Sequence, residues 1–177
     1  MTDVTFRIPT VADAGAIAHL HVACWREAYA GIVPVSILDQ VDMADRTARW
    51  EGHLRNPAAQ AFLAEVAGEP AGFIHRGVLD QPLAEGADGH VFALYLLQRF
   101  HRRGIGRHLV GLAAADWLAR GGRALSLGVL SANQPAVAFY EALGARFVRP
   151  DSYLWHGHSL PESIYVFEDL AGLSRFA

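Results

Sequence analysis

The sequence is poor in the features that mark secreted and membrane proteins. It contains one cysteine, Cys24, in 177 residues, which excludes an internal disulfide and favours a reducing compartment. Its start, MTDVTFRIPT, lacks the basic residues and the apolar run of a secretory signal. No apolar run approaches the roughly 18 to 20 residues of a membrane-spanning helix. We therefore expect a soluble, cytoplasmic protein that does not associate with a membrane.

The sequence also lacks an excess of positive charge. The formal net charge is −3 at pH 7, which argues against general binding of nucleic acids. Four of the 15 positive residues nevertheless form one locally basic strip of the chain, at Arg99, Arg102, Arg103 and Arg107. This strip, rather than the whole surface, is where an anionic ligand is expected.

The composition is that of one globular domain. With 52% apolar and 19% charged residues, the chain can fill a core without a disulfide or a metal, and we expect a single domain over residues 1–177. Alternation and apolar runs predict strands over residues 4–8, 60–66, 70–78, 91–97, 124–130, 145–149 and 163–168. Helical spacing and capping residues predict helices over residues 12–30, 35–40, 44–54, 104–120 and 134–143. Segments 80–89 and 150–162 are predicted to be loops.

The segment HVFALYLLQRFHRRGIG, residues 90–106, joins an apolar strand to a helix through a glycine-containing turn. A helix N-terminus presents backbone N–H groups without intrahelical partners and a partial positive charge, so it can bind phosphate oxygens. Gly104 and Gly106 would let these N–H groups approach the ligand, and the basic strip can add charge-assisted contacts. The segment therefore predicts a diphosphate site.

Two other phosphate-binding motifs fit this segment poorly. The dinucleotide fingerprint needs a third glycine where the sequence has Leu109. It also needs an acidic residue about twenty positions further on, and residues 123–127 contain none. A P-loop, GxxxxGK followed by Ser or Thr, is absent from the sequence. A GxG pair alone can also mark an ordinary strand-to-helix turn, so the surroundings must decide.

Those surroundings resemble one family. The run FHRRGIGRHLV is similar to the acetyl-CoA pyrophosphate motif of the GCN5-related N-acetyltransferase (GNAT) superfamily, with His101 in a position where the family pattern has Gln or Arg. Downstream, NQPAVAFYEALGARFV is similar to the next motif of the family, with Asn133 in the place that contacts the cofactor and Tyr140 in the place of the general acid. The resemblance covers about residues 62–148.

The resemblance implies an α/β (α+β) GNAT fold. Its central sheet would be twisted, mixed but mostly antiparallel, with about six to seven strands, about four flanking helices and a splay between the fourth and fifth strands. Acetyl-CoA would be the co-substrate, with no metal. The implied cofactor-binding residues are Leu94, Tyr95, Leu96, His101, Arg102, Arg103, Gly104, Ile105, Gly106, Arg107, Asn133 and Tyr140.

Acyl transfer needs a backbone donor for the oxyanion, an acid for the departing sulfur and an acceptor for the amine proton. The resemblance places the Leu94 N–H at the thioester oxygen, where such a donor contributes on the order of 3 kcal/mol. Tyr140 is protonated at neutral pH and can act as the acid, although a tyrosine at this spacing can also simply close a helix face. His90 takes the place of the family's glutamate base. Its alternative is a solvated residue at the start of the strand, with the amine losing its proton to bulk water.

The remaining candidates concern the acceptor and metals. Family resemblance places Trp25, Tyr29 and Trp155 near the acceptor site, although core packing or a dimer contact would explain them equally well. The pairs His19 with His21 and His156 with His158 lack the spacing of a metal motif. No metal is predicted.

We therefore expect an N-acetyltransferase that moves acetyl from acetyl-CoA to a primary amine by direct attack in a ternary complex. The alternative is a non-catalytic acyl-CoA-binding sensor or regulatory domain. A small-molecule amine or a peptide amine would be the acceptor, and the sequence does not choose between them. The family resemblance also allows a homodimer.

Overall fold

One seven-stranded sheet, in the order β1-β2-β3-β4-β5-β7-β6, forms the centre of the computed structural model, which describes residues 3–155 and 157–177. His156 lies outside the described residues. The strands are β1 (Val4–Arg7), β2 (Gln60–Val66), β3 (Glu69–Gly77), β4 (Gly89–Leu96), β5 (Leu125–Leu130), β6 (Arg146–Trp155) and β7 (His158–Phe167). The helices are α1 (Ala14–Tyr29), α2 (Val35–Leu38), α3 (Met43–Arg55), α4 (Ile105–Ala119), α5 (Gln134–Ala142) and α6 (Leu170–Ser174). In the part of the chain that the structure describes, no helix has the length and apolar character needed to cross a membrane.

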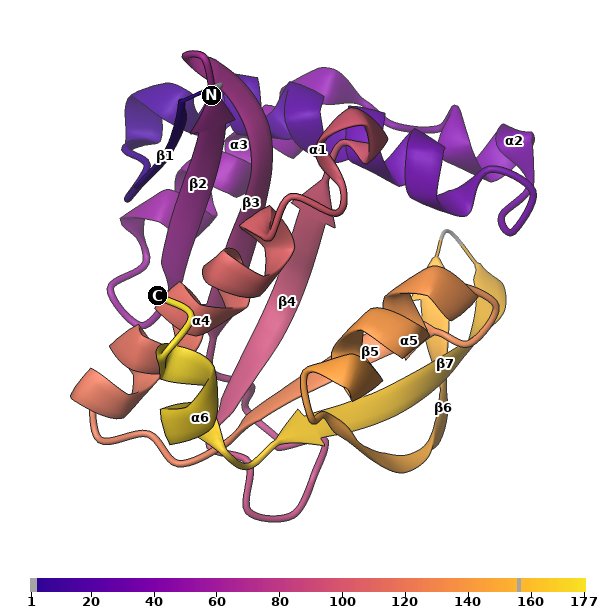
Figure 1. Cartoon of the computed structure of the whole chain (residues 1–177). Coiled ribbons are helices and arrows are strands. Elements are labelled where there is room, and N and C mark those ends of the chain that lie inside the picture. The colour runs from indigo at the N-terminus through magenta and orange to yellow at the C-terminus, as the bar shows by residue number, and fades with distance from the viewer. Residues whose placement is uncertain (1–2, 156) are drawn as a thin grey trace.

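The sheet is interrupted between β4 and β5, the only parallel neighbours in it. These strands pair only from Gly89 opposite Leu125 to Val91 opposite Leu127, and beyond this point they diverge (Figure 1). Next to the last pair, the register of β3 against β4 shifts, which leaves Phe92 without a direct partner. Such a bulge bends a strand and increases its twist. The predicted splay between the fourth and fifth strands is confirmed.

The helices cover the two faces of the sheet separately. On one face, Phe73 of β3 makes edge contacts with His21 of α1 and Trp50 of α3. Arg76 points to the other face, where its guanidinium pairs with Asp116 of α4. Because neighbouring side chains of a strand point to opposite faces, α1 and α3 lie on one side of the sheet and α4 on the other.

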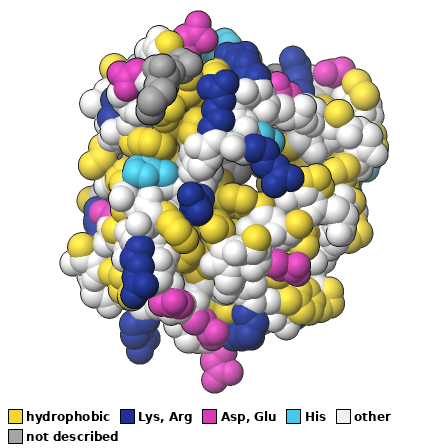
Figure 2. Space-filling model, viewed as in Figure 1, with side chains coloured by type: hydrophobic (Ala, Val, Ile, Leu, Met, Phe, Trp, Pro, Cys, Tyr) yellow, Lys and Arg dark blue, Asp and Glu magenta, His cyan; other side chains and the backbone are white. Residues whose placement is uncertain are grey.

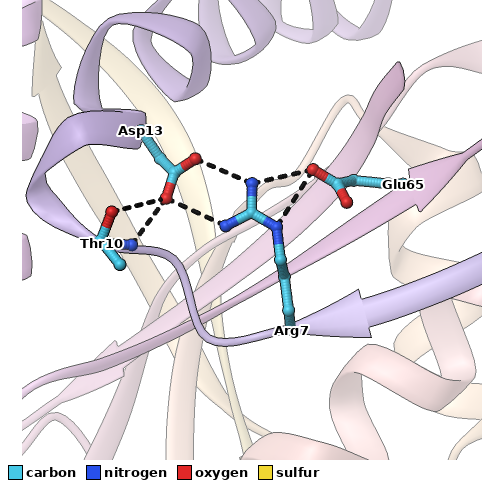
Figure 3. Close-up of polar contacts among 4 residues, drawn as sticks. All are labelled: Arg7, Thr10, Asp13 and Glu65. Atoms are coloured by element: carbon cyan, nitrogen blue, oxygen red, sulfur yellow. Dashed lines mark hydrogen bonds and ion pairs between the residues drawn. The ribbon is translucent and has the colours of Figure 1, made fainter. Parts of the chain in front are cut away.

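An ion-pair network fixes the N-terminal strand to the first long helix (Figure 3). The Arg7 guanidinium donates to both Asp13 carboxylate oxygens, at 2.8 and 2.9 Å. Its Nη2 also donates to Oε1 of Glu65, on β2, at 2.8 Å. Asp13 also accepts hydrogen bonds from the Thr10 N–H and hydroxyl. The contact with Arg7 holds the pKa of Asp13 well below its usual value. The turn from β1 into α1 is thereby tied to the second strand.

The main error of the sequence prediction is the loop predicted over residues 150–162, of which residue 156 lies outside the described residues. Residues 150–155 form the second half of β6 and residues 158–162 the start of β7, in a long antiparallel pair. Two prolines suggested a break, but Pro150 lies on the edge strand, where a ladder hydrogen bond is dispensable. The Pro161 carbonyl accepts from the Ser131 N–H. The backbone nitrogen of Pro161, which carries no hydrogen, points to the same side, past the end of β5. The short helix α6 was also not predicted.

Candidate active site

The turn before α4 has the backbone geometry that its glycine predicted. Gly104 precedes the helix with φ of +80°, and Arg102 also has a left-handed φ of +61°. The His108 N–H makes the first helical bond, to the Gly104 carbonyl. The N–H groups of the three residues between them therefore lack intrahelical acceptors. This helix N-terminus can bind an anion.

Gly106 also lies close to the neighbouring helix α5. A Cβ at this position would lie 3.3 Å from the Phe139 ring of α5. The absence of a side chain thus lets α5 approach the first turn of α4.

The basic side chains around the turn are exposed. Arg103 lies over the Phe100 ring at 5.5 Å and Arg107 over the Phe176 ring at 4.8 Å. Among the described residues, neither these two nor Arg102 forms an ion pair, whereas Arg99 pairs with Glu69. Figure 2 shows positive side chains in the middle and upper part of the viewed face, with most acidic ones nearer its edge. The three unpaired arginines are therefore available to an anionic ligand.

The backbone of β4 presents unpaired groups to the splay. The Leu97 N–H donates to Ala71 on the side of β3. Because successive backbone groups of a strand alternate in direction, the groups of Leu96 and Leu94 point away from β3, toward the diverging β5. His101 Nε2 donates to the Leu96 carbonyl at 2.8 Å. This bond gives His101 a role in positioning the turn after β4.

The two motif residues of the second segment lie on α5. Tyr140 is buried and packs on Phe139 and Phe167. Burial, with an electrostatic contribution from Tyr29, raises the pKa of Tyr140 above its usual value. Asn133 caps α5, with its side-chain oxygen accepting from the N–H at position 136, so its NH₂ group is left to donate elsewhere.

His90 is buried rather than solvated. Its Nδ1 lies 2.9 Å from the Ser126 hydroxyl, which in turn donates to the Gly89 carbonyl. Because the Ser126 hydroxyl proton is directed to the Gly89 carbonyl, the Ser126 oxygen accepts a hydrogen bond from His90 Nδ1. His90 Nε2 then carries the lone pair. Burial lowers the His90 pKa to about 4, so the ring is neutral at pH 7. Phe92 packs against its edge.

A cavity of about 140 Å³ opens on the side of the sheet covered by α1 and α3, beside the splay. Its walls are mainly aromatic and include the three predicted acceptor-site residues, Trp25, Tyr29 and Trp155. The Trp25 and Trp155 rings stack with centroids 4.4 Å apart. The Tyr29 hydroxyl is 3.0 Å from that of Tyr95, which also lines the cavity.

Two charged residues of this cavity were missed from the sequence. Arg46 comes from α3, and Glu162 comes from β7. Glu162 stood at the end of the predicted loop, and Arg46 is one of many polar residues on a helix, so neither belonged to a motif. Alternation of Leu160, Glu162 and Ile164 was a weak signal for an earlier start of β7, but Pro161 argued against it.

The other reactive side chains do not add a second centre. In residues 3–155 and 157–177, no group of three or more His, Cys, Asp or Glu side chains is arranged to hold a metal. Cys24 is buried in the main core, and burial raises its thiol pKa to about 12. A thiol that remains protonated is a poor nucleophile.

Comparison with known proteins places this geometry in a family. The Acetyltransferase (GNAT) family profile matches residues 16–145. The chain therefore belongs to the acetyltransferase (GNAT) family.

Individual relatives span almost the whole chain. YuaI, an uncharacterised N-acetyltransferase of Bacillus subtilis (strain 168), is 29% identical over 170 residues, which are 96% of each chain. The PaiA N-acetyltransferase of Thermoplasma acidophilum, solved in complex with coenzyme A, superposes with a TM-score of 0.73 at 17% identity, covering 91% of this chain and 98% of that one. NAA60 of Arabidopsis thaliana, solved in complex with acetyl-CoA, gives 0.71 at 16% identity, covering 93% and 98%. These structures confirm the GNAT fold.

Proposed function

We propose that the protein transfers acetyl from acetyl-CoA to a primary amine by direct attack in a ternary complex. The observation that carries this proposal is the splay between β4 and β5, because both strands line the aromatic cavity and a thioester bound in the splay would lie within reach of the buried Tyr140. Support also comes from family membership and from the two structural neighbours solved with coenzyme A or acetyl-CoA. The splay would admit the donor, and the cavity would admit the acceptor.

Backbone groups would hold most of the cofactor. The pyrophosphate would accept hydrogen bonds from the free N–H groups at Ile105, Gly106 and Arg107, with the exposed arginines adding charge. The pantetheine arm would lie against β4 and bond to the groups of Leu94 and Leu96 that face the splay. The Asn133 NH₂ group, which the helix cap leaves free, would donate to the same cofactor.

The reaction balances without a covalent enzyme intermediate. The acceptor ammonium first loses one proton, and its nitrogen then forms a bond to the thioester carbon. The Leu94 N–H stabilises the resulting oxyanion. The C–S bond breaks as the sulfur takes the Tyr140 proton, and the second nitrogen proton passes through solvent to restore Tyr140. The products are the N-acetylated amine, coenzyme A and one proton.

His90 is our candidate for the first proton acceptor. Its Nε2 lone pair is the free one, because Nδ1 donates to Ser126. Phe92 separates the ring from the cavity, so a proton would reach it through a bridging water. A base with a pKa of about 4 is weak, and we expect its removal to lower kcat/KM about tenfold or less.

Release of coenzyme A during incubation with acetyl-CoA and a panel of primary amines tests this function. Amine-dependent release that yields an N-acetylated product is the expected result. The chain contains no lysine, so acetylation of its own side-chain amines cannot supply a false signal. Tight binding of acetyl-CoA without release for any amine would favour the alternative, a non-catalytic sensor domain.

A further inference from the structure

Among the described residues, the lining of the aromatic cavity includes two side chains of opposite charge, Arg46 and Glu162. Arg46 and Glu162 are both partly buried. Among the described residues, the side chain of neither one forms an ion pair or a hydrogen bond, with each other or with a third group. Other charged side chains of the same segments are paired, such as Arg49 with Asp45. Unpaired charges in a partly buried site are costly to keep, so their presence points to a ligand that completes them.

Glu162 is placed at the floor of the splay. A Cβ at Gly128 would clash with Oε1 of Glu162, so the carboxylate lies directly on this glycine. Gly128 follows Leu127, the last residue of β5 that pairs with β4. Burial, assisted by Asp151, raises the pKa of Glu162 above its usual value. This carboxylate therefore lies where β4 and β5 begin to diverge, and the acceptor nitrogen would lie beside it in the proposed reaction.

Arg46 supplies the opposite charge from a different wall. It projects from α3, and its guanidinium lies 5.6 Å from the centre of the Trp155 ring. Partial burial lowers its pKa, but a guanidinium remains charged at neutral pH. Its planar fork matches the two oxygens of a carboxylate. The stacked rings of Trp25 and Trp155 line the same cavity as these two charges.

We infer that the acetyl acceptor is a zwitterionic amine of the amino-acid type, with its nitrogen at Glu162, its carboxylate at Arg46 and an apolar or aromatic body against Trp25 and Trp155. This inference rests on the proposed acetyl transfer and names the acceptor class. A peptide or polyamine would bring an amine without a neighbouring carboxylate, and would leave Arg46 unpaired. Arg46 and Glu162 thus act as specificity-determining residues.

A matched set of three acceptors tests the inference: L-phenylalanine, L-phenylalaninamide and 2-phenylethylamine. They share the amine and the ring and differ in the carboxylate. We expect kcat/KM for L-phenylalanine to exceed that of the other two at least tenfold. Arg46→Gln should lower kcat/KM for L-phenylalanine about tenfold, so that its ratio to kcat/KM for the other two acceptors falls close to one. Arg49→Gln is a matched change on an exposed face of α3 and should keep the ratio of the unmodified protein.

Two further variants test the position of Glu162. Glu162→Gln keeps the shape of the side chain and removes its charge, and should lower kcat/KM for all three acceptors about tenfold. Gly128→Ala keeps the carboxylate but displaces it, and should reproduce this loss. The melting temperature identifies any variant that fails to fold. A folded Gly128→Ala with unchanged kinetics would contradict the assigned position.

The outcomes separate this inference from the proposed function. Transfer that prefers 2-phenylethylamine or the amide, or that is indifferent to Arg46→Gln, overturns the acceptor class and leaves acetyl transfer intact. If no amine causes release of coenzyme A, the result counts against acetyl transfer. The acceptor class is then tested by the binding of L-phenylalanine. In the presence of coenzyme A, L-phenylalanine should quench the tryptophan fluorescence saturably, more weakly after Arg46→Gln. No saturable quenching, or quenching unaffected by the substitution, overturns it.

Discussion

The two sides of the splay are built in different ways. The side proposed for the cofactor comes mainly from one continuous stretch, β4 and the turn into α4, with Asn133 and Tyr140 added from α5, and it offers mainly backbone N–H and C=O groups. The cavity proposed for the acceptor is assembled from side chains of α1, α3, β4, β5, β6 and β7. A site made of backbone groups depends on local conformation, whereas a site made of side chains depends on the packing of distant segments.

This difference predicts where substitutions act. Changes on the cofactor side should alter acetyl-CoA affinity or the chemical step without changing the choice of amine. Changes in the cavity should alter acceptor kinetics without changing acetyl-CoA affinity. Tyr140 is the proposed proton donor in the chemical step, so it provides the sharpest test.

Tyr140→Phe should have the largest effect. Loss of the proton donor to the sulfur should lower kcat by about 10² to 10³, the usual scale of general acid catalysis, while the dissociation constant of acetyl-CoA changes by less than about threefold. Steady-state kinetics and calorimetric titration measure the two quantities. Tyr165→Phe removes another buried tyrosine hydroxyl, bonded to Glu141, and should leave kcat unchanged. An unchanged rate in Tyr140→Phe would remove this residue as the acid.

Acidification should destabilise the protein through the face that carries the cavity. Burial is the main cause that lowers the pKa of His75 to about 3 and of His90 to about 4, with His53 and Arg76 adding to the effect at His75. Unfolded histidine titrates near 6.5, so between about pH 6.5 and 4 the unfolded state binds more protons. The free energy of unfolding is then highest above pH 6.5 and falls by about 2 kcal/mol per histidine between pH 7 and pH 5.

Urea denaturation at pH 7, 6 and 5 measures this dependence. His90→Gln should remove about half of the loss due to these two histidines, while His19→Gln, at an exposed position of α1, should not change the slope. A pH dependence that is identical in His90→Gln would contradict the assignment. The rings of His75 and His90 both contact Phe92, which lines the cavity.

The contrast also explains what could be predicted from the sequence. The turn at Gly104 could be predicted from a local pattern, because strand, turn and helix are consecutive, whereas the splay was implied only by the resemblance to the GNAT family. Arg46 and Glu162 are 116 positions apart in the chain, and only the tertiary fold brings them to one cavity. The far end of β6 and the start of β7 were missed because Pro150 and Pro161 predict breaks unless the strand edges that they occupy are known.

Gly106→Ala tests how far the cofactor turn depends on packing. The added methyl group should push Phe139 and the start of α4 apart, raising the dissociation constant of acetyl-CoA about tenfold, which corresponds to about 1.4 kcal/mol. Phe139→Leu in the same chain should restore most of the affinity, because it removes the contact. Failure of this rescue would instead assign Gly106 to direct contact with the pyrophosphate. Acceptor preference should be unchanged in both variants.

Leu94 should show the smallest effect of all on catalysis, although it lies at the centre of the proposed site. Its N–H, rather than its side chain, is the proposed oxyanion donor, and the side chain packs against the main core. Leu94→Ala should therefore lower the melting temperature through lost packing, while kcat at a temperature where the variant is folded stays within about twofold. A tenfold fall in kcat with an unchanged melting temperature would contradict the backbone assignment, because it would mean that the side chain itself touches the reacting atoms.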